Sequence, residues 1–203
     1  MCVDPTGHSP KWWQWLLFGI GAALVVGAVT VLTMGVGTSI MATTMAGAVM
    51  HGAAVGTLIG AGIGAGLGAV IGGATSDWSV EGILEGAMTG FGVGAFVGAI
   101  AGGSVGAIQY TNAANSWLGG KEKMIDHYMK HGLDMKYKNV VDYTKAAKRV
   151  IANGKYITSK NAYSIFIKGN KYLFAGVGKG TKLITTFSYR TFTKSTALLL
   201  GLI

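Results

Sequence analysis

The hydrophobic pattern divides the chain into a long apolar part and a polar, basic part. Residues 12–34 contain no charged side chain. As a helix rising about 1.5 Å per residue they reach roughly 34 Å, which is enough to cross a bilayer. Trp12, Trp13 and Trp15 stand at one end of this segment, as aromatic residues do where a membrane helix meets water. The segment predicts a membrane-competent helix, and the alternative is a helix buried in a soluble assembly.

Glycine recurs at every fourth position in the two apolar segments that follow, residues 40–74 and 87–109. The two repeats comprise Gly52, Gly56, Gly60, Gly64, Gly68 and Gly72, then Gly90, Gly94, Gly98, Gly102 and Gly106. Small residues at this spacing let two helix backbones approach closely. The polar stretch 75–82 separates the repeats, and Ser76 or Asp77 is suited to cap the second helix. We therefore expect a helical hairpin with a glycine zipper.

The hydrophobic period changes after a polar stretch that ends at Gly119-Gly120. Residues 121–131 and 139–152 predict two helices, the second ending at Asn153-Gly154. Alternating aromatic and β-branched residues then predict strands at 156–157, 162–168, 171–175 and 182–189. Gly169-Asn170 is suited to a two-residue hairpin turn between two of these strands. The tail at 196–203 is apolar, too short to cross a bilayer, and suited to cover the edge of the sheet.

These patterns predict an α+β fold, with glycine-zipper hydrophobic helices followed by a small domain of two helices and an antiparallel sheet. We divide the chain into residues 1–11, a hydrophobic helical region at 12–119 and a basic α+β domain at 120–203. Charge supports this division. Residues 121–203 carry sixteen Lys and Arg against four acidic residues, a net charge of +12, whereas residues 1–120 carry one Lys against four acidic residues.

A basic segment of this size favours a polyanionic partner, which is nucleic acid, an anionic membrane or an acidic protein. The alternative is a soluble domain that is simply rich in lysine. Cys2 is the only cysteine, so neither an internal disulfide nor a cysteine metal cluster is expected. The glycine repeats lack the lysine of a phosphate-binding loop. We expect no cofactor and no metal.

Two of the four histidines, His127 and His131, stand four residues apart with Lys130 between them. On a helix this spacing places both imidazoles on one face. Such a pair suits metal-free acid–base chemistry on a phosphodiester, because one ring takes a proton, the other gives one, and a lysine offsets the charge of the transition state. The alternative is a pair of solvated histidines on an exposed helix face.

Two segments upstream of the basic domain resemble parts of large polymorphic toxins. Residues 2–8, CVDPTGH, are similar to the end of the motif that closes Rhs/YD-repeat shells. Residues 77–87, DWSVEGILEGA, are similar to a stretch that precedes the toxin in Gram-positive Rhs and wall-associated toxins. The resemblance implies that the chain is the C-terminal tip of a protein with an upstream repeat shell, and that its glycine-rich region is a pretoxin segment for delivery across a membrane.

The basic segment itself resembles toxin domains of the barnase/EndoU/colicin/RelE-like ribonuclease group. The matching positions are His127, Tyr128, Lys130, His131 and Gly132, then Tyr143 and Ala147, then Ile184, Thr186 and Phe187. One departure is that Ser188-Tyr189-Arg190 stands where a proline is expected after the last strand. The resemblance implies an endoribonuclease in which the 2′-hydroxyl attacks the adjacent phosphate.

The resemblance also implies roles for particular residues. His127 is expected to be the general base or acid, with His131 as its partner or as a structural hydrogen-bonder. The other expected site residues are Lys130 on the phosphate, Thr186 with Tyr189 or Arg190 holding the scissile group, and Lys182 binding the substrate. The expected partners are RNA, an acidic immunity protein and the target membrane. The protein would be a secreted or cell-surface effector whose toxin domain acts in the target-cell cytoplasm.

Two other function classes fit the same sequence. In the first, the glycine-zipper hairpin forms a membrane pore and the basic domain only binds anionic lipid. In the second, the chain is a non-enzymatic membrane-associated module whose basic domain binds a partner, and neither histidine matters to any activity.

Overall fold

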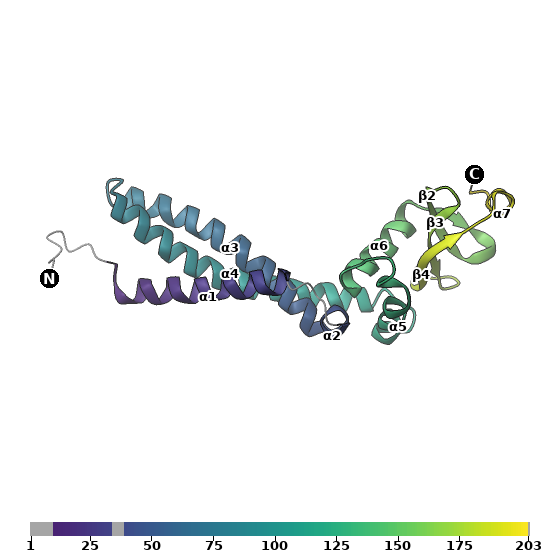
Figure 1. Cartoon of the computed structure of the whole chain (residues 1–203), viewed down its shortest axis with the longest axis horizontal. Coiled ribbons are helices and arrows are strands. Elements are labelled where there is room, and N and C mark those ends of the chain that lie inside the picture. Colours follow the sequence, from purple (N-terminus) through teal and green to yellow (C-terminus); the bar gives the residue numbers. More distant parts are fainter. Residues whose placement is uncertain (1–9, 34–38, 203) are drawn as a thin grey trace. The chain divides into compact units, whose positions relative to one another are not determined.

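A computed structural model describes residues 10–33 and 39–202 of the chain (Figure 1). The described residues form two compact units. Residues 10–33 and 49–107 make up the first, which we call the helical unit, and residues 39–48 and 108–202 make up the second, which we call the basic domain. The expected α+β class is confirmed, because long apolar helices come first and an antiparallel sheet lies near the C-terminus.

Three long helices supply the helical unit: α1 (Trp12–Thr33), α3 (Met45–Thr75) and α4 (Val80–Ala114). The expected hairpin of α3 and α4 is confirmed, and so is its zipper. Each glycine of the first repeat faces a glycine of α4, and a Cβ added to it would lie only 2.0–2.2 Å from the facing carbonyl oxygen. The facing pairs are Gly52 and Gly102, Gly56 and Gly98, Gly60 and Gly94, Gly64 and Gly90, Gly68 and Gly86, and Gly72 and Gly82. The two backbones therefore touch directly, which no larger residue permits.

A tight turn joins α3 to α4 and corrects one detail of the expected hairpin. Asp77 and Trp78 both have positive φ, at 50° and 61°. Ser79, and neither Ser76 nor Asp77, caps α4, because its Oγ accepts a hydrogen bond from the backbone N–H of Gly82 at 3.1 Å. Ser76 instead donates to the carbonyl oxygen of Gly72 at 2.7 Å and so closes the end of α3.

The helix α1 packs on α4 through small residues as well. A Cβ added at Gly92 would lie 2.4 Å from the carbonyl oxygen of Leu17, and one added at Gly21 would lie 2.8 Å from the Cα of Gly92. The rings of Phe18 and Phe91 lie beside this contact, with their centroids 5.5 Å apart. Close backbone approach thus holds all three helices of the unit.

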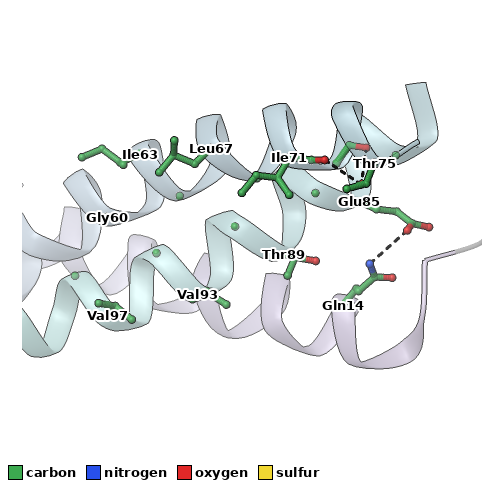
Figure 2. Close-up of a pocket in the computed structure, with 18 of the residues that line it drawn as sticks. Gln14, Gly60, Ile63, Leu67, Ile71, Thr75, Glu85, Thr89, Val93 and Val97 are labelled. Atoms are coloured by element: carbon green, nitrogen blue, oxygen red, sulfur yellow. Dashed lines mark hydrogen bonds between the residues drawn. The ribbon is translucent and has the colours of Figure 1, made fainter. Parts of the chain in front are cut away.

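Many large apolar side chains of the helical unit are exposed. A groove of ≈ 940 Å³ runs along α3 and α4 (Figure 2). Its glycine floor is flanked by Ile63, Leu67 and Ile71 of α3 and by Thr89, Val93 and Val97 of α4. The helices α1, α3 and α4 are each long and apolar enough to cross a membrane, as expected for α1 and for the hairpin.

In the basic domain, two helices precede the sheet, and a π-helical turn lies between them. The helix α5 (Gly120–His127) runs directly into the π-helix η1 (Tyr128–Gly132), and α6 (Val140–Asn153) follows. Asn139 caps α6 by accepting a hydrogen bond from the backbone N–H of Asp142 at 2.8 Å. Both expected helices are present, but the first changes to π geometry at Tyr128. The short helix α2 (Ser39–Thr43) also belongs to this domain.

Four strands follow as an antiparallel meander in the order β1-β2-β3-β4. Their bounds are β1 (Lys155–Ile157), β2 (Ala162–Lys168), β3 (Lys171–Val177) and β4 (Ile184–Thr191), with a short 3-10 helix, η2 (Thr158–Lys160), after β1. The expected hairpin turn is present, with Gly169 at a φ of 60°. The strand β3 is longer than expected and β4 begins later, because residues 178–183 form the turn between them.

The two faces of the sheet are covered differently. The first packs on α6, with Tyr143, Ala147 and Phe187 fully buried in the main core. The other face carries Phe174, which packs with Ile157 and Ala162 against the tail residues Leu200 and Leu202. The tail includes the helix α7 (Lys194–Leu199). It therefore covers a face of the sheet near the edge strand β1 and leaves the other edge strand, β4, to the site described next.

Candidate active site

A small pocket of ≈ 190 Å³ lies between the end of η1 and the edge strand β4. The residues that line it are His131, Asp134, Met135, Ser188, Tyr189 and Arg190. Three of these six were expected as site residues from the sequence: His131, Tyr189 and Arg190. Residues more than fifty positions apart along the chain therefore meet at one concave surface.

The π-turn places His131 at this pocket. Tyr128 is buried beneath the turn and its hydroxyl donates to the carbonyl oxygen of Tyr137 at 2.9 Å. A Cβ added at Gly132 would lie 2.3 Å from the Tyr128 ring, so only glycine fits where the turn folds back over that ring. An inserted π-turn is frequent at functional sites, because it re-aims side chains that a regular helix would spread around its axis.

An aromatic cluster supports the pocket from below. The Tyr143 ring lies 5.1 Å from that of Phe187 and 5.7 Å from that of Tyr137, by centroids, and the Tyr143 hydroxyl donates to the carbonyl oxygen of Phe187. Burial raises the pKa of Tyr143 well above its ordinary value. Burial, followed by the neighbouring Tyr189, also raises the pKa of Tyr137. Both phenols therefore stay protonated, and the cluster fixes β4 to α6 and to the loop after η1.

His127 lies behind His131, away from the pocket lining. Its ring stacks on Trp117 at 5.3 Å and lies 5.9 Å from the His131 ring, by centroids. Its Nδ1 is buried and has no hydrogen-bond partner among the described residues. Burial, and then the positive charge of Lys123, lowers the pKa of His127. The ring is therefore neutral at pH 7, and it packs between Trp117 and His131.

Tyr189 and Arg190 reach the pocket from opposite faces of β4, because neighbouring residues of a strand point to opposite sides. The Lys171 ammonium lies 3.8 Å from the centroid of the Tyr189 ring. The Arg190 guanidinium lies 5.6 Å from the centroid of Phe174, which belongs to the other face. The pocket thus opens at the edge of the sheet, with cations on both sides of β4.

Three further expected residues lie outside the pocket lining. Lys130 forms an ion pair with Asp126, with its Nζ 2.7 Å from the carboxylate, and its side chain is 62% exposed. Thr186 is half-buried and pairs with Gly176 of β3. Lys182 is exposed in the turn between β3 and β4. The structure brings His131, Tyr189 and Arg190 together and leaves these three residues apart from them.

Comparison of the chain with known proteins finds no relative. No family model, no curated protein and no solved structure matches the chain. The segment CVDPTGH at residues 2–8 lies outside the described residues. Within the described part of the chain, no group of three or more His, Cys, Asp and Glu residues is placed to hold a metal ion.

Sequence reasoning missed three of the lining residues: Asp134, Met135 and Ser188. Ser188 directly precedes two expected residues, but β4 is an edge strand of the sheet, and this position becomes visible only with the strand order. Asp134 and Met135 follow Gly132 in a loop where Lys136 has a φ of 61°. The direction of that loop depends on the π-turn, which the four-residue spacing of the histidines does not reveal.

Proposed function

We propose that the basic domain is the ribonuclease toxin domain of an Rhs-type polymorphic effector. The observation that carries the proposal is the meeting of His131, Tyr189 and Arg190 around one pocket. An imidazole and a phenol can exchange protons with the reacting oxygens, and a guanidinium can stabilise the charge on the phosphate, so the three groups suit phosphodiester cleavage without a metal. The net charge of +12 on residues 121–203 supports the proposal, because it attracts a polyanionic substrate.

The pocket suggests a division of labour among the three side chains. His131 takes the proton of the 2′-hydroxyl, because a ring nitrogen of an imidazole can act as a general base. The 2′-oxygen attacks phosphorus, the bond to the 5′-oxygen breaks, and the leaving oxygen takes a proton from the Tyr189 hydroxyl. Arg190 binds the phosphate oxygens, where a guanidinium offers paired hydrogen bonds and positive charge. The products are a 2′,3′-cyclic phosphate and a free 5′-hydroxyl.

His127 has a different role in this proposal from the one that the sequence suggested. Its neutral ring stacks on Trp117, with the ring centroids 5.3 Å apart. It also contacts the His131 ring but does not line the pocket. We therefore treat His127 as a positioning residue and His131 as the acid–base group. A stacked neutral ring restricts the rotation of its neighbour without placing a second positive charge beside it.

The test uses the full chain, purified in detergent, and an RNA oligonucleotide with end-group analysis of its products. Native protein is expected to leave 2′,3′-cyclic phosphate ends, and an all-DNA oligonucleotide is expected to stay intact. His131→Ala should lower the rate by about 10²–10⁴-fold, and Arg190→Ala by about 10²–10³-fold. Arg149→Ala, at an exposed position of α6, is the matched control. Equal cleavage by His131→Ala and native protein would contradict the proposal.

The delivery context belongs to the same proposal. The basic domain would follow an upstream repeat shell in the whole effector, cross the membrane of a competitor cell and act in its cytoplasm. A producing cell would then need an inhibitor, and the charge of the tip favours an acidic immunity protein that covers the pocket. An acidic protein that binds the native chain and blocks RNA cleavage in proportion to its occupancy is the expected partner.

A pore is the second candidate function. The observation that favours it is the outward-facing apolar surface of the helical unit, with three helices long enough to span a bilayer. A pore predicts toxicity that survives His131→Ala and rapid release of a small dye from phospholipid vesicles. Loss of toxicity in that variant, with cleaved RNA in cells that carry native protein, would favour the nuclease.

A further inference from the structure

All charged residues of the helical unit that the structure describes lie at one end of it. Residues 12–76 contain no Asp, Glu, Lys or Arg, and neither do residues 86–120. The charges between and before them are Asp77, Glu81 and Glu85 around the turn from α3 to α4, and Lys11 just before α1. Gln14 of α1 donates to the carboxylate of Glu85 at 3.4 Å (Figure 2). This contact places the start of α1 and the start of α4 side by side.

Exposed tryptophans gather at the same end. Trp12 is 76% exposed and Trp15 is 56% exposed at the start of α1, and Trp78 is 63% exposed in the turn. Tryptophan is enriched where a bilayer meets water, because its ring is apolar and its N–H is polar. This end of the unit therefore has the composition of a membrane interface.

The body of the helical unit has the composition of a lipid-facing surface. Leu67 in the middle of α3 is 60% exposed and Val97 of α4 is 57% exposed, whereas the faces between α3 and α4 are made of glycine. Helices satisfy their own backbone groups, so they tolerate hydrocarbon on all sides. Hydrocarbon chains of phospholipid are the occupant that fits both the exposed side chains and the groove between them.

We infer that α1, α3 and α4 insert as three spans, with the acidic end left on the side from which the protein arrives and the basic domain on the other side. An odd number of spans places the two ends of a chain on opposite sides of a bilayer. The segment that joins α1 to α3, residues 34–44, carries no charged residue, so it crosses without desolvating one. The acidic turn between α3 and α4 stays behind, and α4 leads to Lys121.

A membrane potential that is negative on the far side favours this arrangement. The residues that reach the far side carry a net charge of +12, and those that stay behind carry a net charge of −3. The electrical work gained on transfer grows with the charge moved. The excess of Lys and Arg also lies on the side that the positive-inside rule assigns to the cytoplasm. The inference rests on the membrane role proposed for the helical unit and is independent of the nuclease chemistry.

Trypsin gives a direct test, because Lys11 is the only Lys or Arg before Lys121. The full chain is diluted from detergent onto sealed vesicles of neutral and anionic phospholipid with a potential that is negative inside, and trypsin is added outside. The expected product is a fragment that runs from Trp12 to the C-terminus. A fragment that ends at Lys121 would mean that the basic domain stayed outside, and an uncut Lys11 would mean that the N-terminal side had crossed. Either result overturns the inference.

Three variants sharpen this test. Val80→Lys adds a trypsin site at the start of α4, beside the turn, and external trypsin should cut there in inserted protein. Leu67→Asp should lower the protected fraction at least tenfold, whereas Val80→Asp, at a similarly exposed position beside the turn, should leave it unchanged. Equal loss in both would show that the body of α3 does not face lipid. Vesicles opened with detergent must yield the fragment that ends at Lys121, which confirms that trypsin cuts the accessible basic domain.

The outcomes separate this inference from the two proposed functions. The His131→Ala variant should be protected from external trypsin to the same extent as native protein, because the pocket has no part in insertion. Dye release from the same vesicles, with the basic domain still cut at Lys121, would overturn the inference in favour of a pore. RNA cleavage in detergent without protection in vesicles would leave the nuclease intact and remove the three-span arrangement.

Discussion

The two units of the chain bury opposite kinds of residue. All of the largest fully buried side chains in the described residues belong to the basic domain: Tyr128, Tyr143, Phe187, Met124, Ile184, Val140, Val150 and Thr144. The helical unit buries small residues such as Ala54, Ala61 and Ala95, and it exposes many larger ones, such as Ile63 and Leu67. The basic domain buries many of its large apolar side chains, whereas the helical unit has many of them on its surface.

This difference teaches which force holds each unit together. The aromatic core of the basic domain removes large apolar areas from water, so the hydrophobic effect stabilises it. Glycine and alanine contacts in the helical unit remove little area, and their benefit is close van der Waals contact between backbones. The helical unit is therefore expected to need lipid or detergent for its stability, whereas the basic domain is not.

The largest expected effect is on the aromatic core. Tyr143→Ala removes a fully buried ring that packs against Trp117, Tyr137 and Phe187, and it should cost the basic domain about 3–5 kcal/mol of unfolding free energy. Amide hydrogen exchange measures the loss separately in β2 to β4 and in α3 and α4, and only the strands should lose protection. Tyr156→Ala, at a tyrosine that is 45% exposed, should cost about 1 kcal/mol or less. Equal losses in both units would mean that they do not fold independently.

Two glycines of α3 give the next prediction, with opposite signs. A Cβ at Gly64 would lie 2.1 Å from the carbonyl oxygen of Gly90, whereas a Cβ at Gly62 meets nothing within 4 Å. Gly64→Ala should destabilise the hairpin by about 1–3 kcal/mol through overpacking. Gly62→Ala should stabilise it by about 0.5–1 kcal/mol, because alanine is the better helix former. The measurement is thermal unfolding in detergent, monitored by the helical circular dichroism signal. Unfolding midpoints that shift equally and in the same direction in both variants would count against the zipper.

The pH dependence of the basic domain is a smaller effect. Burial, and then Lys123, lowers the pKa of His127 below its ordinary value of 6.5. The unfolded chain therefore binds this proton more readily than the folded one. The contribution to stability is complete above pH 6.5 and is lost as pH falls through the lower folded pKa. His127→Phe keeps the contact with Trp117 and removes the titration, so it should flatten the fall in the protection of β2 and β3 between pH 7.5 and 5.5. An unchanged pH profile in this variant would assign the effect to other groups.

The smallest effect is expected at Lys130, which the sequence placed at the phosphate. Its ammonium binds Asp126 at the surface, and exposed pairs of this kind contribute little. Lys130→Ala should leave both the rate of RNA cleavage and the unfolding midpoint nearly unchanged. A loss of cleavage as large as that of His131→Ala would restore Lys130 to the site, and the kinetic assay that tests His131 measures it directly.

Much of the fold follows from the sequence, because the patterns are long and regular. The glycine repeat predicts which faces of α3 and α4 meet, and alternation of apolar residues predicts the four strands and the turn at Gly169. The cap of α4 was misplaced because Ser76, Asp77 and Ser79 are all suitable capping residues. Only the positive φ angles of Asp77 and Trp78, which extend the turn, decide for Ser79.

The candidate site was predicted only in part, for a physical reason. Spacing along one element places His127 and His131 together, and they do lie 5.9 Å apart by ring centroids. Which of the two faces the pocket depends on the buried ring of Tyr128 and on Gly132, which together widen the turn. Which residues of β4 reach the same pocket depends on β4 being an edge strand of the sheet. Both conditions are set by tertiary packing, and no local pattern contains them.

The four-residue repeat of the zipper also makes its alignment ambiguous. Sliding α3 along α4 by one repeat, about 6 Å, still sets at least five of the six facing glycines of α3 against a glycine of α4. The contact surface therefore accepts several alignments, and the short turn between Thr75 and Ser79 selects one. After a cut in that turn, α3 and α4 could shift along each other in steps of about one helical turn. The polypeptide connection is therefore what selects a single alignment of the two helices.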